Sequence, residues 1–267
     1  MITDLHVVVT EDRILLDVPA DLASGLLQRL DQSLFSEDVH LTDLSSALAS
    51  VWVHGPAAVS AIERVLAASG LESWPAYRHA SASFDDAVIR IVRIDQLGTP
   101  GYCIYIDAPR RPDLRAAFTA AGVQDAHSDA VEAARVEAGY PVFGVDMTED
   151  TIPLEAGIED RAISFTKGCY VGQEVIVRVL HRGHGRVVRR LMGLRLEGMV
   201  PRGARLLADG REIGAVTSVA HSPSAGPVGM GYVHRDFAAS GTRVAAEAAG
   251  ETVAAVVSDR PIASDGR

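Results

Sequence analysis

The chain has 267 residues, is 48% hydrophobic and carries a formal net charge of -10. This length and apolar content suffice for one large or two modest folded domains, which excludes general disorder. The acidic excess disfavours nonspecific binding to nucleic acid phosphates, and the longest apolar runs are far shorter than the roughly 20 residues of a membrane-spanning helix.

The N-terminus and the cysteines indicate a cytoplasmic protein. Residues 1–9 have neither the basic segment nor the long apolar segment of a secretory signal. The two cysteines, Cys103 and Cys169, are far apart and form no C-x-x-C pair. We therefore expect reduced thiols, no disulfide scaffold and no metal site.

From Leu5 to about Gly122 the apolar spacing alternates between periods of 2 and 3.6 residues, which is typical of an α+β fold. Strands are expected near Leu5–Val9, Ile14–Val18, Val39–Leu44, Ala47–His54, Ala87–Ile94 and Tyr102–Ile106. Helices are expected over Pro19–Ser33, Pro56–Ala68 and Pro112–Ala121. Repeated strand-helix-strand units of this kind predict ferredoxin-like α/β layers, with helices on an antiparallel sheet, over residues 1–125.

Residues 126–192 form the second predicted region. It has a helix over Asp129–Ala138, an acidic loop between Asp146 and Asp160, and a further helical pattern over Cys169–Leu180. The third region, residues 193–260, consists of short apolar runs punctuated by glycine. Such a pattern predicts a small C-terminal β-barrel.

One octapeptide, residues 167–174, reads Lys-Gly-Cys-Tyr-Val-Gly-Gln-Glu. If Cys169 lies at a helix N-terminus beside Lys167, the helix dipole and the ammonium both favour a reactive thiolate. The alternative is a plain loop that leads into a helix and carries a half-buried thiol. Cys103, which lies within an apolar strand, is expected in the core.

The octapeptide resembles the signature of the YgfZ-type folate-binding family, within the glycine-cleavage T-protein (aminomethyltransferase) superfamily. Residues 134–139, which read Ala-Arg-Val-Glu-Ala-Gly, look like the Arg-x-Glu-Ala-Gly segment of that superfamily, and residues 152–157 resemble its next block. Residues 212–218 and 229–233 resemble its C-terminal barrel. The resemblance implies a T-protein-like fold and tetrahydrofolate as cofactor.

The resemblance also assigns candidate site residues. Glu137 occupies the place of the glutamate that holds the pterin, and a carboxylate suits the paired N–H donors of that ring. The alternative for Glu137 is a solvated charge at a helix end. Asp4 matches the aspartate near the folate nitrogen, and the alternative is an ordinary aspartate at a strand end. The expected catalytic residues are Asp4 and, from the octapeptide, Cys169. The remaining expected cofactor-binding residues are Lys167, Tyr170, Gln173 and Arg178.

The start of the chain departs from the family pattern, whose members have several tens of residues before the strand that contains Asp4. We expect that the N-terminal part of the first folate-binding domain is missing. Apolar surface should then be exposed near Met1 to Val9.

An arginine-rich stretch runs from Arg178 to Arg195 without an acidic residue. It could receive the glutamate tail of polyglutamyl folate, contact RNA phosphates, or form a solvated face paired with the acidic loop Glu149–Asp160. The third use is the usual one for a run of charges, and the lack of interleaved aromatic residues places direct nucleic-acid binding last.

The resemblance predicts a tetrahydrofolate-binding accessory protein that supports iron-sulfur cluster assembly or repair and tRNA modification. Its partners would be folate and iron-sulfur client proteins, and not a membrane. The alternative is an enzyme, a folate-dependent aminomethyltransferase of the T-protein type. A third hypothesis is a structural relative that binds nothing.

Overall fold

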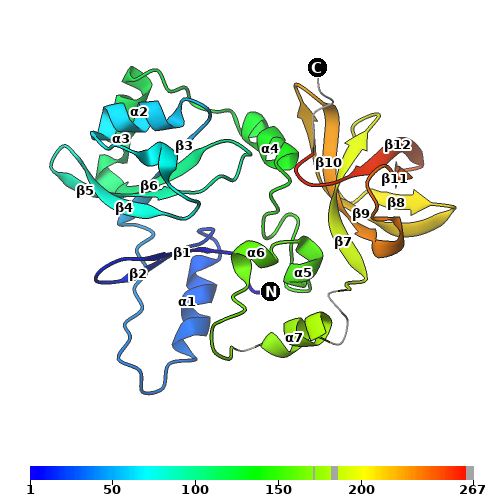
Figure 1. Cartoon of the computed structure of the whole chain (residues 1–267), viewed down its shortest axis with the longest axis horizontal. Helices are drawn as coiled ribbons and strands as arrows, with labels where there is room; N and C mark the ends of the chain where they lie inside the picture. Colours follow the sequence, from blue (N-terminus) through cyan, green and yellow to red (C-terminus); the bar gives the residue numbers. More distant parts are fainter. Residues whose placement is uncertain (171, 182–185, 263–267) are drawn as a thin grey trace. The chain divides into compact units, whose positions relative to one another are not determined.

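The computed structural model describes residues 1–170, 172–181 and 186–262 of the chain. The chain divides into two compact units (Figure 1). The N-terminal unit is Leu5–His127, and the barrel unit is Met1–Asp4 together with the chain from Ser128 onward. Within the described ranges, every helix is too short or too polar to traverse a lipid bilayer.

The N-terminal unit is built on a four-stranded antiparallel sheet in the order β3-β6-β5-β4. Its strands are β3 (Leu48–His54), β4 (His79–Phe84), β5 (Ala87–Arg93) and β6 (Gly101–Asp107). Helices α2 (Ala58–Leu66) and α3 (Arg111–Ala120) cover one face of this sheet. The predicted layering of helices on an antiparallel sheet is therefore present.

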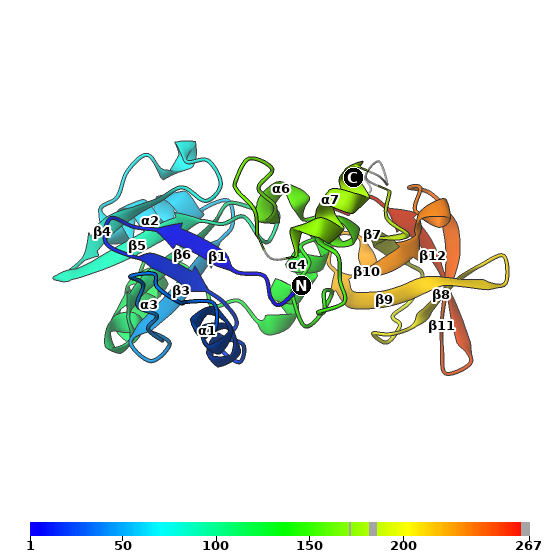
Figure 2. The ribbon, with the colours of Figure 1, turned by 90° about the horizontal axis from the view of Figure 1, so that it is seen from below.

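Both faces of the sheet are covered, because the hairpin of β1 (His6–Val9) and β2 (Ile14–Asp17) packs on the second face. Figure 2 shows β1 crossing the sheet. Val8 and Leu15 of the hairpin contact Val92, Cys103 and Tyr105. A strand covered on both faces is a continuous apolar run, which explains why residues 101–106 of β6 are all buried. Cys103 lies in the core, as predicted.

The outer face of the hairpin remains exposed. Val7, Val9, Ile14 and Leu16 are 56%, 59%, 63% and 39% exposed, and cross-strand pairing places them on one face. This confirms the predicted exposed apolar surface near Met1 to Val9. Helix α1 (Ala23–Asp31), which follows the hairpin, has no fully buried residue.

One prediction for this unit was wrong, and one strand was missed. The segment Val39–Leu44 is not a strand, although its sequence alternates in the manner of one. Strand β4 was not predicted, because its sequence His-Ala-Ser-Ala-Ser-Phe has few of the β-branched and aromatic residues that strands favour. It nevertheless pairs with β5 along its whole length.

The barrel unit ends in a closed antiparallel barrel in the order β10-β7-β12-β11-β8-β9, which confirms the predicted C-terminal barrel. Its strands are β7 (Arg189–Leu196), β8 (Arg205–Ala208), β9 (Arg211–Ser222), β10 (Gly226–His234), β11 (Arg243–Ala248) and β12 (Glu251–Ser258). Inward-facing aliphatic side chains such as Leu194, Leu206 and Val257 fill its interior.

Among the described residues of this unit, four helices precede the barrel: α4 (Ser128–Glu137), α5 (Pro153–Ala156), α6 (Glu159–Ala162) and α7 (Gln173–His181). Helix α4 packs Ala133 and Val136 against Val228 and Met230 of β10. Because the Arg-x-Glu-Ala-Gly segment begins on α4 and continues into the turn after it, this packing fixes the start of that segment on the outside of the barrel.

Candidate functional site

A buried arginine joins α4 to the barrel. Arg135 is 6% exposed, and its guanidinium donates to Asp146 Oδ2 (2.7 Å) and Ser218 Oγ (2.7 Å). It also makes two bonds to Glu132, one of them 2.8 Å from Nε. Asp146 in turn accepts from the hydroxyl groups of Thr217 and Ser218, both at 2.6 Å. We call these five residues the Arg135 network.

The Arg135 network keeps its central charge. Burial by itself would lower the pKa of Arg135, but the hydrogen bond with Glu132 and the nearby charge of Asp146 raise it overall. Sequence reasoning identified Arg135 and Asp146 only as parts of motifs. It missed their pairing with Ser218, which lies 83 residues from Arg135.

The end of α4 is fixed by a second arginine. Arg260 donates from Nη1 to the carbonyl of Gly139 (3.0 Å) and from Nη2 to that of Ala156 (2.7 Å). Gly139 has φ +66°, and a Cβ there would lie 2.5 Å from the Cβ of Arg260. Glycine adopts this positive φ without strain and has no Cβ to clash with Arg260, which gives a structural reason for glycine at the end of the segment. The backbone N–H of Ile262 also bonds to the carbonyl of Glu137 (2.8 Å).

Glu137, held between these contacts, is not a solvated helix-end charge. The residue is half-buried, and its Oε1 is inaccessible to solvent without a hydrogen-bond partner among the described residues. A buried acceptor without a donor costs about 1–3 kcal/mol, so such groups are rare unless a ligand supplies the donor. Because Oε1 is inaccessible to a water-sized group here, a rotation of the Glu137 side chain is needed before it can accept an N–H group from a bound molecule.

Further buried polar atoms without partners among the described residues lie in the same unit: Glu159 Oε2, Arg161 Nη2 and Tyr232 Oη. These three side chains all act electrostatically on Arg260, whose own pKa is lowered by burial. Arg161 also stacks on the ring of Tyr140, with its guanidinium carbon 4.3 Å from the centroid. The neighbourhood of Arg260 therefore contains several unused donors and acceptors as well as the end of α4.

The structure brings together three of the predicted residues in the octapeptide. The ammonium of Lys167 lies 4.6 Å from the centroid of the Tyr170 ring, and the backbone N–H of Tyr170 donates to Gln173 Oε1 (3.3 Å). Cys169 lies between them with its side chain exposed. Val171 of the octapeptide lies outside the described residues.

The helix predicted over Cys169–Leu180 begins later than predicted. Helix α7 begins at Gln173, and Gly172 before it has φ +89°, so Cys169 precedes the helix. The helix field falls off within the first turn, and the ammonium of Lys167 lies on the Tyr170 ring. This geometry matches the alternative of a loop that leads into a helix, with the thiol exposed rather than half-buried.

The arginine-rich stretch is used in part as an ion-pairing face. Arg189 Nε bonds to Glu155 Oε2 of the acidic loop at 2.9 Å, and its guanidinium carbon lies 4.7 Å from the centroid of the Tyr232 ring. Arg178 is exposed on α7. Arg182 and His184 of the same stretch lie outside the described residues.

Asp4 belongs to the same unit as Glu137 and is half-buried. Its segment is anchored by Met1, whose ammonium donates to the carbonyl of Glu149 (2.6 Å) and whose side chain packs beside Met147. Within the described ranges, no hydrogen bond or ion pair joins Asp4, Glu137 and the octapeptide to one another. They share a unit, and the contacts between them remain a prediction.

No predicted site residue lines the cavity of about 480 Å³ in the N-terminal unit, whose walls include β2 and α1. Over the described parts of the chain, no group of three or more His, Cys, Asp or Glu side chains is arranged to hold a metal ion.

Comparison with known families covers nearly the whole chain. A family model described as the GCVT N-terminal domain matches residues 1–167, and one described as the glycine cleavage T-protein C-terminal barrel domain matches residues 189–263. A crystal structure of the glycine cleavage system aminomethyltransferase T from Bartonella henselae superimposes with a TM-score of 0.85 and 25% identity. The match covers 98% of this chain and 72% of that one, which confirms the predicted T-protein-like fold.

Curated relatives carry related names. An aminomethyltransferase from Nostoc sp. is 31% identical over 88% of this chain and 61% of its own length. One from Thermosynechococcus vestitus is 31% identical over 86% of this chain and 62% of its own length. A putative chloroplastic transferase from Arabidopsis thaliana is 26% identical over 96% of this chain and 58% of its own length. The chain thus spans about three fifths of the length of these relatives.

Proposed function

Because the chain belongs to the glycine-cleavage T-protein family, we propose that it binds tetrahydrofolate and takes part in folate-dependent aminomethyl transfer. The names of the curated relatives support the reaction class. The observation that carries the proposal is the buried, unpartnered Oε1 of Glu137.

Glu137 supplies the recognition. An ionised carboxylate is an acceptor with two oxygens, and the pterin ring edge presents paired N–H donors that match them. Binding would give the buried Oε1 the donor that it lacks. The Arg135 network and Arg260 hold the backbone on both sides of Glu137, so the position of this helix end is fixed before the ligand arrives.

Asp4 and the octapeptide supply the rest of the proposed site. When bound, tetrahydrofolate carries the one-carbon unit on its nitrogen atoms. We assign the Asp4 carboxylate to that end of the ligand, where it accepts a hydrogen bond or a proton from the reacting nitrogen. Lys167, Tyr170 and Gln173 complete the proposed cofactor contacts, and the exposed Arg178 offers a guanidinium to the glutamate tail.

Titration calorimetry with tetrahydrofolate tests the binding. Glu137→Gln keeps the shape but replaces one acceptor by a donor, so we expect a loss of about 2 kcal/mol, roughly 30-fold in Kd. The control is Glu251→Gln, which alters an exposed glutamate on β12 and should leave Kd unchanged. Equal affinity of the wild type and Glu137→Gln would refute the role of Glu137.

Catalysis is tested separately from binding. Asp4→Asn should lower folate-dependent turnover of an aminomethyl donor at least tenfold, because a carboxylate can accept a proton and the amide of asparagine cannot. The Kd for tetrahydrofolate should change less than threefold. An unchanged turnover rate would remove Asp4 from the reaction.

A second candidate function is the accessory role in iron-sulfur cluster assembly or repair and tRNA modification, acting in the cytoplasm. The exposed Cys169 within the YgfZ-type octapeptide favours it. An exposed thiol can contact a client protein or its cluster, although a single thiolate cannot hold a cluster alone. Cells that carry Cys169→Ser should then lose iron-sulfur enzyme activity while tetrahydrofolate binding is retained. Full activity in those cells would reject this candidate.

A further inference from the structure

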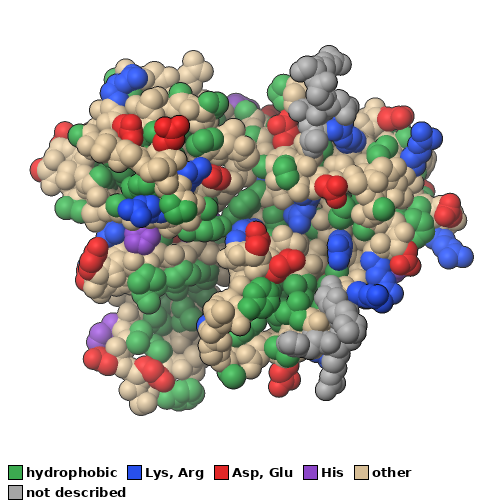
Figure 3. Space-filling view, viewed as in Figure 1, with side chains coloured by type: hydrophobic (Ala, Val, Ile, Leu, Met, Phe, Trp, Pro, Cys, Tyr) green, Lys and Arg blue, Asp and Glu red, His purple; other side chains and the backbone are tan. Residues whose placement is uncertain are grey.

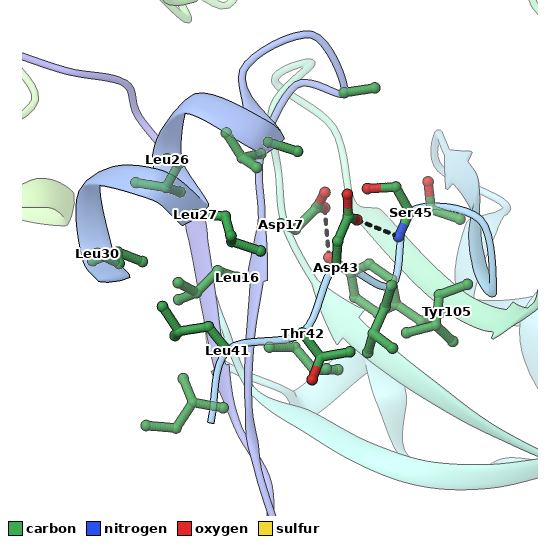
Figure 4. Close-up of a pocket in the computed structure, with 18 of the residues that line it drawn as sticks. Leu16, Asp17, Leu26, Leu27, Leu30, Leu41, Thr42, Asp43, Ser45 and Tyr105 are labelled. Carbon is green, nitrogen blue, oxygen red and sulfur yellow. Dashed lines mark hydrogen bonds between the residues drawn. The ribbon is translucent and has the colours of Figure 1, made fainter. Parts of the chain in front are cut away.

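Four aromatic rings of the N-terminal unit form a group that we call the His6 cluster. Its members are His6, Trp52, His54 and Tyr77. The centroid of the His6 ring lies 6.2 Å from that of Trp52 and 6.2 Å from that of Tyr77. Trp52 and His54 are stacked, with 5.6 Å between their centroids and 3° between their planes. The leucine-lined cavity of the same unit, which Figure 4 shows, contains none of these residues.

The sheet fixes the position of the stacked pair. Trp52 and His54 are two residues apart on β3, so their side chains lie on the same face. His54 pairs with Gly101 of β6, where a Cβ would lie 2.4 Å from Nδ1 of His54. The absence of a side chain at Gly101 therefore gives the imidazole ring its place. Burial lowers the pKa of His54 from 6.5, so this ring is mostly neutral at pH 7.

Tyr77 has an unfavourable backbone conformation. Its φ is +64°, in the left-handed region that bulky residues rarely adopt. The turn is held by the N–H of Tyr77, which donates to the carbonyl of Arg93 (2.8 Å), and by the N–H of Arg93, which donates to the carbonyl of Arg78 (2.9 Å). Glycine would adopt this φ without strain, yet the position carries a tyrosine that is 42% exposed. A strained and exposed aromatic residue indicates a role other than packing.

An amide lies at the edge of the cluster. Gln96 Nε2 is 3.0 Å from His6 Nε2, and within the described ranges this is the hydrogen bond that the Gln96 side chain makes. The amide therefore keeps its carbonyl oxygen and a second N–H for a ligand. Because the His6 ring contacts both Gln96 and Tyr77, a flat molecule stacked on the tyrosine ring is within reach of the amide.

The surrounding charges favour a neutral ring over a polyanion. Asp95, which acts electrostatically on His54, already accepts from Nε of Arg93 (3.2 Å) and from the N–H of Gly101 (2.9 Å). Acidic and basic side chains are interspersed on the face of the N-terminal unit that Figure 3 shows. The net charge of -10 also disfavours a long nucleic acid. A single ring with hydrogen-bonding edges suits this surface best.

Adenine has the matching groups. Its 6-amino donor lies beside the acceptor N7, and a glutamine amide can pair with both at once. Its two fused rings also offer a broad face for stacking on an aromatic side chain. We propose that the His6 cluster binds the adenine ring of a nucleoside or mononucleotide. The base stacks on Tyr77 and pairs with the amide of Gln96, while His6 fixes the distance between these two residues.

The fluorescence of Trp52 reports the binding. The chain has two tryptophans, so Trp74→Phe leaves Trp52 as the single fluorophore. Titration of this protein with adenosine should change its emission and saturate below about 1 mM. Purine riboside, which lacks the 6-amino group, should bind about fivefold more weakly or worse. AMP should bind within about tenfold of adenosine, because the base carries the recognition.

Three results of these titrations overturn the proposal. The first is the absence of a saturable change with adenosine. The second is equal affinity for adenosine and purine riboside, which would leave the amide of Gln96 without a role. The third is binding of AMP without binding of adenosine, which would show a phosphate site in place of a base site.

Tyr77→Gly separates binding from folding. It removes the ring and relieves the positive φ, so adenosine affinity should fall about tenfold or more while the midpoint of thermal unfolding does not fall. Tyr77→Phe keeps the stacking face and should retain the affinity. Gln96→Leu should remove the difference between adenosine and purine riboside. The control is Phe35→Gly, which removes a ring that is 90% exposed and should leave the affinity unchanged. Retained affinity in Tyr77→Gly, or a loss of affinity together with stability, overturns the proposal.

Discussion

Replacement of Arg135 by methionine should destabilise the barrel unit strongly. Methionine fills similar space but leaves the side chain of Asp146, which is 0% exposed, without its cationic partner. Removal of one partner from a buried ion pair costs about 3–5 kcal/mol. Asp146 keeps the hydroxyl donors Thr217 and Ser218, so we expect a value near the lower limit, about 3 kcal/mol.

Native-state hydrogen exchange measures this loss at the amides of β9 and β10, which are the strands beside α4. The control is Arg205→Met, because Arg205 is 54% exposed in its pair with Glu247 and should contribute less than about 1 kcal/mol. The double variant Arg135→Met with Asp146→Leu should be less destabilised than the sum of the two single changes. A loss below about 1 kcal/mol for Arg135→Met would refute the reasoning.

Three further outcomes follow from the structure. A thiol reagent should titrate the exposed Cys169 in the folded protein and reach the buried Cys103, whose thiol pKa is raised by burial, only in denaturant; two fast thiols would contradict the fold. Gly139→Ala should lower the free energy of unfolding, measured by denaturant titration, by at least about 2 kcal/mol, since the new Cβ sits at a positive φ and clashes with Arg260. The control Gly122→Ala also has a positive φ, +89°, but its Cβ meets no atom within 4 Å, so it should cost about 1 kcal/mol. Burial lowers the pKa of His54 from 6.5, so the unfolded chain takes up the proton at a higher pH than the folded chain. The resulting contribution of His54 to stability is complete above pH 6.5 and decreases as the pH falls below that value. His54→Gln should therefore reduce the loss of stability between about pH 7 and 5, and an unchanged dependence of stability on pH would contradict this prediction.

Local patterns in the sequence predicted most of the fold. Strand β6 was predicted from its apolar run, the barrel from its glycine-punctuated strands, and α4 from its helical spacing. The segment Val39–Leu44 shows where this method fails, because alternation reports the tendency to pair and not the presence of a partner strand. Strand β4 is the converse case, since its weak sequence is compensated by pairing with β5.

The candidate site was only partly accessible from the sequence. Motif resemblance identified Glu137, but the unpartnered state of its Oε1 depends on neighbours that the sequence does not place beside it. The contact of Arg260 with Gly139 spans 121 residues, so no local pattern could indicate it. The start of α7 was placed too early because the helical pattern in the sequence continues back to Cys169. In the structure the positive φ of Gly172 interrupts the helix, which begins at Gln173.

A crystal structure of the chain with tetrahydrofolate would test the central claim most directly. We predict that the ring edge of the pterin donates two hydrogen bonds to the carboxylate of Glu137, one of them to the buried Oε1. A pterin bound elsewhere, with Oε1 still unpartnered, would contradict the account.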